Sequence, residues 1–564
     1  MGNLYFYEEN WQGAIDSYIL AIAAVELSRS WANSEQSKQE IIEKAIHVYF
    51  NLVQCCINTQ QYDKALEYAE RSKSRNLIEL LATRDLYPKG DIPTDILSQL
   101  DTLRRQVLSE ERRISQRSDF GNSIDPGSRG IANQNTTGID PDRERLFTLK
   151  QDLDNLIIDR VQPIDPSFQL TQQVQSIDFA TMQSALPNAQ TALLTWYISN
   201  SRIHAFLVTP HHKQPHIINY TPEQYEALDN LRATYLDTYR TDKENWRETL
   251  PNLLQQISQI LNLPEIITKL LQLNPDCNQI ILIPHRILHL LPLHALPLNE
   301  AGDCLLDLFP KGVSYAPSIQ LLKLSQQWHR PPLQRLFAIQ NPTNDLRYTD
   351  VEVPAICDRF QPHVEIVKGK QADKAALSSE GLNQANCVHF SCHGSFNFEN
   401  PLASALILSG GKSDLDKCLT LGEIFQLDLR QCGLVTLSAC ETGLTDFRST
   451  GDEYIGLPSG FLYAGSSNVV SSLWAVSDLS TTFLMIKFYQ NLKEADSVAI
   501  SLNQAQQWLR EVTQLELLDW ISYLTLRASQ QTLVESWTDK LDSVDDNTRI
   551  FHSPYHWAAF CAIG

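Results

Sequence analysis

Two short stretches of the sequence decide the fold: Cys387-Val-His-Phe-Ser-Cys-His393-Gly394 and Gly433-Leu-Val-Thr-Leu-Ser-Ala-Cys440-Glu-Thr-Gly443. Each is an apolar run of strand length that stops at a reactive side chain followed by small residues. In an open parallel sheet, the groups that do chemistry lie just beyond the carboxyl ends of the strands. The spacing, 440 − 393 = 47, leaves room for a helix between two neighbouring strands. We therefore expect His393 and Cys440 to meet at one edge of a shared sheet.

A histidine beside a cysteine is the pair that nucleophilic catalysis by a thiol needs. The thiolate is the attacking form, and an imidazole can take the thiol proton and later give it to the leaving amine. The backbone N–H groups of Gly394 and Cys440 are the candidates to stabilise a developing oxyanion. Taken singly, Cys440 fits a small buried hydrophobe and His393 fits a structural histidine. The two strand endings together favour catalysis.

A metal site is the alternative interpretation of the first stretch, because Cys387, His389, Cys392 and His393 are crowded together. On a strand, residues 387, 389, 391 and 393 share one face, so Cys392 points to the other. Structural zinc needs four ligands that converge as a tetrahedron, commonly as two pairs. No second pair lies nearby in the sequence, so we expect neither a metal nor a cofactor.

The charge of the chain bears on its partners. Its 564 residues include 46 basic and 66 acidic side chains, a balance of 46 − 66 = −20. Such a surface repels nucleic acid and anionic lipid, and it suits a basic protein or peptide.

No apolar run is long enough to span a membrane, and the N-terminus lacks the layout of a signal peptide. The 11 cysteines show no disulfide spacing, which predicts reduced thiols in the cytoplasm.

The first 90 residues have the pattern of helical hairpins. Asn10-Trp-Gln-Gly-Ala14 and Gln61-Tyr-Asp-Lys-Ala65 match with an offset of 65 − 14 = 51, each placing a small Ala where helices pack closely. The pattern resembles tetratricopeptide repeats, and an ordinary amphipathic bundle is the alternative. Residues 91–176 predict a second helical hairpin, with a mobile loop over about 119–142 that is rich in turn formers.

From about residue 177 the sequence alternates between strand and helix patterns, which predicts an α/β layer structure with a mostly parallel central sheet flanked by helices. Residues 513–547 resemble a helical insertion before the last strand. The predicted strands are 192–197, 203–208, 279–283, 336–339, 364–367, 388–391, 434–438, 468–473 and 558–563.

The strand endings resemble the signature of the caspase-like cysteine peptidases: an apolar strand then His-Gly, followed by an apolar strand then Ala-Cys. More specifically, residues from about 180 to 564 resemble the CHAT domain, a caspase-like module related to separases and found with tetratricopeptide repeats. Further matching segments, in the order of the family, include Leu290-Leu-Pro-Leu-His-Ala-Leu296, Val313-Ser-Tyr-Ala-Pro317, Gly456-Leu-Pro-Ser-Gly460, Ser472-Leu-Trp-Ala-Val-Ser-Asp478 and His552-Ser-Pro-Tyr-His-Trp557.

The resemblance implies a caspase-like domain over 177–564, with a pseudo-caspase half over 177–335 and a catalytic half over 336–564. It implies that His393 and Cys440 form the catalytic dyad of a cysteine endopeptidase, without an obligatory third carboxylate. It also implies that a partner protein at the helical repeats controls activity.

The resemblance further implies a substrate-binding role for Asp478, because the corresponding separase segment carries an acid that receives the residue before the cut. A carboxylate there would pair with arginine or lysine. The alternative is that Asp478 caps the helix that begins near Leu479. Arg448, in the polar loop 442–453, is a candidate self-cleavage site, although the same loop also fits an ordinary surface loop.

Two functions remain open from the sequence. The first is a cysteine endopeptidase acting on protein or peptide substrates. The second is a catalytically silent scaffold, in which the helical repeats bind a peptide and the α/β part is a passive body.

Overall fold

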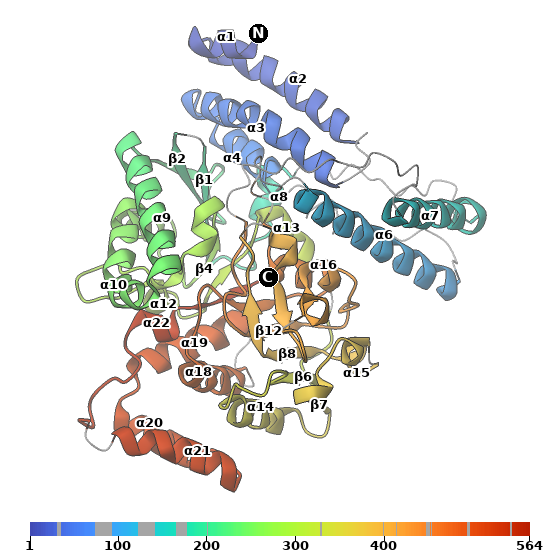
Figure 1. The fold of residues 1–564 in the computed structure, drawn as a ribbon. Coiled ribbons are helices and arrows are strands. Elements are labelled where there is room, and N and C mark those ends of the chain that lie inside the picture. Colours follow the sequence, from blue (N-terminus) through green and yellow to red (C-terminus); the bar gives the residue numbers. More distant parts are fainter. Residues whose placement is uncertain are drawn as a thin grey trace, which may run out of the picture.

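The computed structural model describes residues 1–30, 35–73, 93–121, 141–164, 177–199, 201–326, 330–378, 380–398, 400–412, 414–446, 452, 454–492, 497–541 and 544–564. Helices at the N-terminus lie against a large sheet that carries further helices on both sides (Figure 1). Within these described ranges, none of the helices combines the length and the apolar character needed to cross a membrane.

The N-terminal helices contain a repeated turn. Helices α1 (Gly2–Tyr7) and α2 (Trp11–Ser30) form one pair, and α3 (Glu35–Asn58) and α4 (Tyr62–Arg71) form the next. Glu9 and Gln60 both adopt a left-handed backbone, with φ of 56° and 59°. The sequence offset of 60 − 9 = 51 therefore recurs as a repeat of turn geometry. The assignment to tetratricopeptide repeats stays a prediction.

These helices cover one face of the first strand. In β1 (Thr191–Ile198), Leu193 and Tyr197 join the apolar cluster of the N-terminal helices, and the ring of Tyr197 lies 5.8 Å from that of Phe50 on α3. Trp196 points to the opposite face, into the main core. Every residue of β1 is buried because both faces of the sheet are covered, which explains its continuous apolar run.

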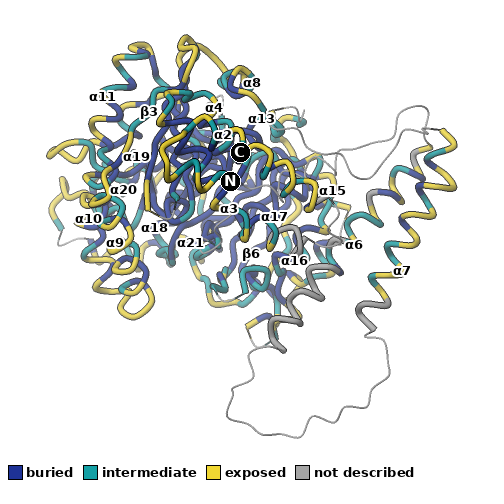
Figure 2. The backbone as a smooth tube through the Cα atoms, turned by 90° about the horizontal axis from the view of Figure 1, so that it is seen from above, coloured by how far each residue is buried: buried dark blue, intermediate teal, exposed yellow. Residues whose placement is uncertain are grey.

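A second helical pair follows. Helix α6 (Thr94–Gly121) packs along α7 (Pro141–Leu156), which continues as a π-helical turn (Ile157–Val161), through a small cluster that includes Leu100 and Leu153. Figure 2 shows that exposed and half-buried residues dominate this pair, in contrast to the buried centre. The predicted loop 119–142 falls mostly on 122–140, outside the described residues.

The central sheet has the order β3-β2-β1-β4-β5-β14-β13-β12-β8-β6-β7. Parallel pairing holds throughout β6, β7, β8, β12 and β13, as it does from β1 through β4 and β5 to β14, so the prediction of a mostly parallel sheet is confirmed. The strands after β1 are β2 (Ile203–Val208), β3 (His216–Asn219), β4 (Gln279–Ile283), β5 (Val313–Tyr315), β6 (Leu336–Gln340), β7 (Val364–Lys368), β8 (Cys387–Ser391), β12 (Leu434–Ser438), β13 (Val469–Ser472) and β14 (Phe560–Ile563).

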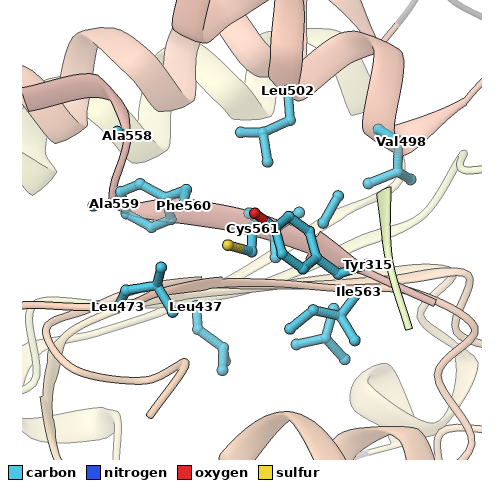
Figure 3. Close-up of a cluster of buried hydrophobic side chains, with 14 of the residues drawn as sticks. Tyr315, Leu437, Leu473, Val498, Leu502, Ala558, Ala559, Phe560, Cys561 and Ile563 are labelled. Carbon is cyan, nitrogen blue, oxygen red and sulfur yellow. The ribbon is translucent and has the colours of Figure 1, made fainter. Parts of the chain in front are cut away.

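Strand β14 joins the two halves of the sheet, because it pairs with β5 on one side and, antiparallel, with β13 on the other. Figure 3 shows the buried side chains around it, with Phe560 and Cys561 packed among Tyr315, Leu473 and Leu502. The core is therefore continuous across both halves.

Helices pack around this sheet. The predicted insertion 513–547 contains α20 (Gln514–Ser522) and α21 (Ala528–Thr538), at the lower left of Figure 1. A small second sheet consists of β9 (His393–Ser395), β10 (Ala405–Ile407) and β11 (Leu419–Thr420). The other α-helices are α8 (Phe179–Gln183), α9 (Pro222–Thr241), α10 (Lys243–Ile260), α11 (Leu263–Leu273), α12 (Leu305–Leu308), α13 (Ile319–Ser325), α14 (Thr349–Cys357), α15 (Glu380–Gln384), α16 (Leu421–Ile424), α17 (Leu457–Ala464), α18 (Asp478–Asn491), α19 (Val498–Glu511) and α22 (Pro554–Trp557).

Candidate active site

The register of two neighbouring strands brings the predicted pair to the same edge of the sheet. Strands β8 and β12 are parallel, and Ser391 lies opposite Ser438. His393 and Cys440 each follow two residues later, because 393 − 391 = 440 − 438 = 2. The backbones also touch, since a Cβ atom added at Gly394 would lie 2.5 Å from the carbonyl oxygen of Cys440. Only glycine fits this approach of the two strand ends.

The imidazole of His393 has a carboxylate partner that the sequence pattern does not single out. Its Nε2 lies 3.1 Å from Oδ1 of Asp345, in the loop after β6, the strand on the other side of β8. Burial alone would raise the pKa of Asp345, but hydrogen bonds from Lys412, Thr343 and His393 hold that pKa below its ordinary value. Asp345 is therefore an ionised acceptor for the His393 ring.

The loop 341–347 holds Asp345 in place through backbone bonds. The side chain of Asn341, itself in a left-handed conformation with φ of 46°, accepts the backbone N–H groups of Asp345 and Leu346 at 3.1 Å each. The Asn341-Pro-Thr-Asn-Asp345 run after a strand is a turn signal, and that signal could have drawn attention to the loop.

Cys440 differs from every other cysteine of the chain. The other ten are buried, whereas Cys440 is half-buried. Burial is the main cause that raises the pKa of its thiol, and the charge of Glu441 adds to the rise. Its sulfur lies 4.0 Å from the carbonyl oxygen of Val476. A thiol with a raised pKa is protonated at neutral pH and needs a base to become a nucleophile.

Asp478 is the first residue of α18, and its side chain does not cap that helix. The N-cap residue is Ser477, while Oδ2 of Asp478 accepts the backbone N–H of Tyr348, at the start of α14, at 3.3 Å. Burial raises the pKa of Asp478 to about 6. Across the described parts of the chain, no lysine, arginine or histidine forms an ion pair with it. The charge of His393 lowers the pKa of Asp478 slightly, and the charge of Asp478 adds slightly to the rise in the pKa of Cys440.

The residue after Cys440 reaches into the other half of the molecule. Glu441 adopts a left-handed backbone with φ of 58°. Its Oε1 accepts the hydroxyl of Tyr239 at 2.5 Å and the ammonium of Lys243 at 3.0 Å. Tyr239 lies on α9 and Lys243 begins α10, so helices of the first half contact the strand end that carries the cysteine.

The buried carboxylate of Asp452, which follows Cys440 in the sequence, contacts residues from other parts of the chain. Both oxygens of Asp452 are engaged, Oδ1 by the backbone N–H of Arg286 at 2.7 Å and Oδ2 by Nε2 of His289 at 3.3 Å. Burial alone would raise the pKa of Asp452, but the charges of His285, His289 and Lys73 hold it below its ordinary value. Lys73 follows α4, so the N-terminal helices contribute to this buried cluster.

The alternative metal interpretation finds no geometric support around His389. Both of its ring nitrogens are engaged, Nε2 with Glu352 at 2.8 Å and Nδ1 with the hydroxyl of Tyr489 at 3.2 Å. Cys387 and Cys392 are fully buried. Among the residues described, no three His, Cys, Asp or Glu side chains are grouped so as to hold a metal ion. His389 is a core residue with satisfied hydrogen bonds.

A family model for the CHAT domain matches residues 251–564, which is more than half of the chain. The chain belongs to the CHAT domain family. Comparison with curated protein sequences found no match. Tyr239 and Lys243 precede the matched segment, so the strand end that carries Cys440 receives contacts from residues outside that segment.

The comparison with solved structures found matches of low sequence identity. The separase of Saccharomyces cerevisiae, in a separase–securin complex, is 12% identical with a TM-score of 0.39; the match covers 89% of this chain and 47% of that one. Gingipain R, an Arg-specific cysteine proteinase, is 10% identical with a TM-score of 0.31, over 56% of this chain and 67% of that one. The CHAT chain thus spans about half the length of the separase chain it matches.

Proposed function

We propose that this CHAT protein is a cysteine endopeptidase, with Cys440 as the nucleophile and His393 as the base. One observation carries the proposal: the only cysteine that is not buried follows β12 at the same register at which a histidine follows β8. Each group alone is common in cores, but a half-buried thiol and an imidazole that follow neighbouring parallel strands at the same register support a thiol protease.

In this proposal, each step of the reaction is assigned to a residue. Asp345 accepts the N–H of His393 at Nε2, which leaves the lone pair on Nδ1 to take the proton of the Cys440 thiol. The thiolate attacks the peptide carbonyl, and the backbone N–H groups of Gly394 and Cys440 stabilise the oxyanion. His393 then protonates the leaving amine. Water, deprotonated by the same imidazole, hydrolyses the thioester and releases the free thiol.

Asp478 serves in this proposal as the acid that receives arginine or lysine before the scissile bond. It is half-buried, it makes no ion pair with a described residue, and burial raises its pKa to about 6. A guanidinium would supply the missing positive charge with two parallel hydrogen bonds. The helix-capping alternative is disfavoured because its carboxylate bonds Tyr348 and not its own helix.

The decisive experiment compares the chain with Cys440→Ala, His393→Ala and the control Cys432→Ala, which removes a buried thiol just before β12. New protein termini are mapped by mass spectrometry after incubation with a whole-cell protein extract. We expect cleavage by the chain and by the control, and none by the two site variants, with thermal unfolding nearly unchanged. Cleavage that persists in Cys440→Ala would reject the dyad.

Iodoacetamide labelling of Cys440 in the chain and in His393→Ala separates the remaining possibilities. The other ten cysteines are buried and cannot serve as the reference. Labelling that is faster in the chain than in His393→Ala, without cleavage of any substrate, indicates a built site held inactive, as regulation by a partner at the N-terminal helices requires. Equal rates in the two, without cleavage, favour the silent scaffold instead.

A further inference from the structure

A single hydroxyl group connects two segments of the candidate active site. The Tyr239 hydroxyl donates to Oε1 of Glu441 at 2.5 Å and accepts the backbone N–H of Ala475 at 2.9 Å. Glu441 directly follows the nucleophile. Ala475 belongs to the segment between β13 and Asp478. Tyr239 thus joins the strand end that carries the Cys440 thiol to the segment that leads to Asp478.

Hydrogen bonds from other parts of the chain hold the backbone of both segments. The left-handed backbone of Glu441, φ 58°, is uncommon for a residue with a side chain and persists only where its surroundings hold it. Its backbone N–H donates to the carbonyl of Trp474 at 3.2 Å, which links it to the same segment. The hydroxyl of Tyr555 donates to the carbonyl of Ala475 at 3.0 Å. Both backbone polar groups of Ala475 are therefore used by tyrosine hydroxyls.

Aromatic contacts fix the position of the Tyr239 ring. Its ring lies 4.9 Å from that of Trp246, which in turn lies 5.5 Å from Trp474 in the core. Burial, together with the negative charge of Glu441, raises the pKa of Tyr239, so the hydroxyl stays protonated and remains a donor. Lys243 bonds the same oxygen of Glu441 but is largely exposed, so Tyr239 provides the defined geometry.

We propose that Tyr239 is a positioning residue of the protease, which sets the geometry between Cys440 and Asp478 through its bonds to Glu441 and Ala475. The inference rests on the proposed peptidase function and deepens it. The residue comes from α9, outside the segment 251–564 that matches the family model. A catalytic half expressed without α9 would lack the hydrogen bonds of Tyr239 to Glu441 and Ala475.

Tyr239→Phe tests the inference, because it removes one hydroxyl and keeps the ring. Tyr235→Phe is the matched control: Tyr235 lies one turn earlier on α9, is also buried, and packs on Trp246 at 5.5 Å without contacting Glu441. Both variants should unfold at nearly the same temperature. Peptides with arginine before the scissile bond, and matched peptides with the uncharged citrulline, serve as substrates.

We expect Tyr239→Phe to lower kcat at least tenfold and to reduce the arginine-to-citrulline ratio of kcat/KM at least threefold. Tyr235→Phe should change neither. In a double-mutant cycle, Glu441→Gln should cost much less in the Tyr239→Phe background than in the native chain, because both act through one contact. Kinetic constants for Tyr239→Phe that equal those of Tyr235→Phe would overturn the inference while leaving the peptidase function intact.

Where no cleavage depends on Cys440, the proposed function is judged by the labelling comparison described above. The positioning role is then decided by the rate at which iodoacetamide labels Cys440. We expect labelling to be at least threefold slower in Tyr239→Phe than in Tyr235→Phe, because a freed Glu441 carboxylate can approach the thiol and disfavour the thiolate. Equal rates would overturn it.

Discussion

The ionised carboxylate of Asp478 is unfavourable for the stability of the folded chain. Burial raises its pKa to about 6, so near neutral pH it is largely ionised without a cationic partner among the described residues. We expect Asp478→Asn to stabilise the folded chain at pH 8 by about 1 kcal/mol, because one pKa unit corresponds to about 1.4 kcal/mol and partial exposure screens the charge. Asparagine keeps the acceptor for the Tyr348 N–H.

The same variant should lose the preference for arginine over citrulline before the cut. In the native chain this preference should rise with pH through about 6, as Asp478 ionises, and the ratio cancels effects of pH that are common to both peptides. The measurement is kcat/KM for both peptides between pH 5 and 8. A ratio that is independent of pH, or unchanged in Asp478→Asn, would show that Asp478 does not select substrates.

Sequence patterns could identify His393, Cys440 and Gly394 as candidates, because each lies where an apolar strand pattern ends and that signal is local. Asp478 became a candidate through the resemblance to separases. Asp345 and Tyr239 were not identifiable in this way. Asp345 lies 393 − 345 = 48 residues from His393, and Tyr239 lies 441 − 239 = 202 residues from Glu441. Their roles depend on which strands become neighbours, and a single sequence does not encode that in any local pattern.

At the scale of elements, the site depends on the close approach of two strand ends. Gly394→Ala would place a methyl group 2.5 Å from the Cys440 carbonyl oxygen and 2.8 Å from Cγ2 of Thr442. Backbone cannot yield as a flexible side chain can, so the strand ends must separate. We expect a fall in activity of at least a hundredfold and a loss of about 1–3 kcal/mol in stability, the range for overpacked sites.

Gly433→Ala provides the control for this substitution. Gly433 lies just before the other end of β12, and its added Cβ would lie 2.9 Å from a side-chain methyl of Leu333. It should therefore cost stability without lowering the rate of iodoacetamide labelling at Cys440. Full activity in Gly394→Ala would mean that the backbone contact is irrelevant to the site.

Elements with long, uniform patterns were predictable, and short ones were not. The predicted strands 388–391 and 434–438 match β8 and β12 closely, because buried parallel strands give continuous apolar runs. Strands β5 and β9 contain three residues each, too few to show a period. β3 is half exposed and pairs at the edge of the sheet, so its short pattern was also missed.

At the scale of the whole molecule, buried histidines should govern stability towards acid. Burial lowers the pKa of His204 to about 4 and that of His294 to about 3, and it holds the pKa of His285 well below its ordinary value. Below about pH 6.5 the unfolded chain binds protons that these folded histidines do not. Each therefore removes about 1.4 kcal/mol of stability between pH 7.5 and 5.5. Asp478, whose pKa is raised, acts in the opposite direction but is a single group.

We expect the denaturant midpoint to fall clearly as the pH is lowered across this range. His294→Gln should reduce the slope by about one proton, although it also weakens the fold at pH 7.5 by altering the bonds to Tyr315 and Gln506. His211→Gln, at an exposed position, is the control for the substitution itself. A midpoint that is flat or rises towards pH 5.5 would contradict this account.

The layer structure and the largely parallel sheet could be predicted from the alternation of strand and helix patterns, but the strand order could not. In particular, the position of β14 between β5 and β13 depends on pairing across 563 − 315 = 248 residues. Nothing local in Phe560–Ile563 distinguishes a central strand from an edge strand.

The central position of β14 has a consequence for biosynthesis. A ribosome makes this strand after every other strand of the sheet, so the nascent chain carries two open edges, at β5 and β13, until Phe560–Ile563 emerges. Open edges invite pairing with other chains. Newly made polypeptide is thus exposed to misassembly from the synthesis of β13 until that of β14, and the neighbouring strand ends can settle only after the late strand inserts.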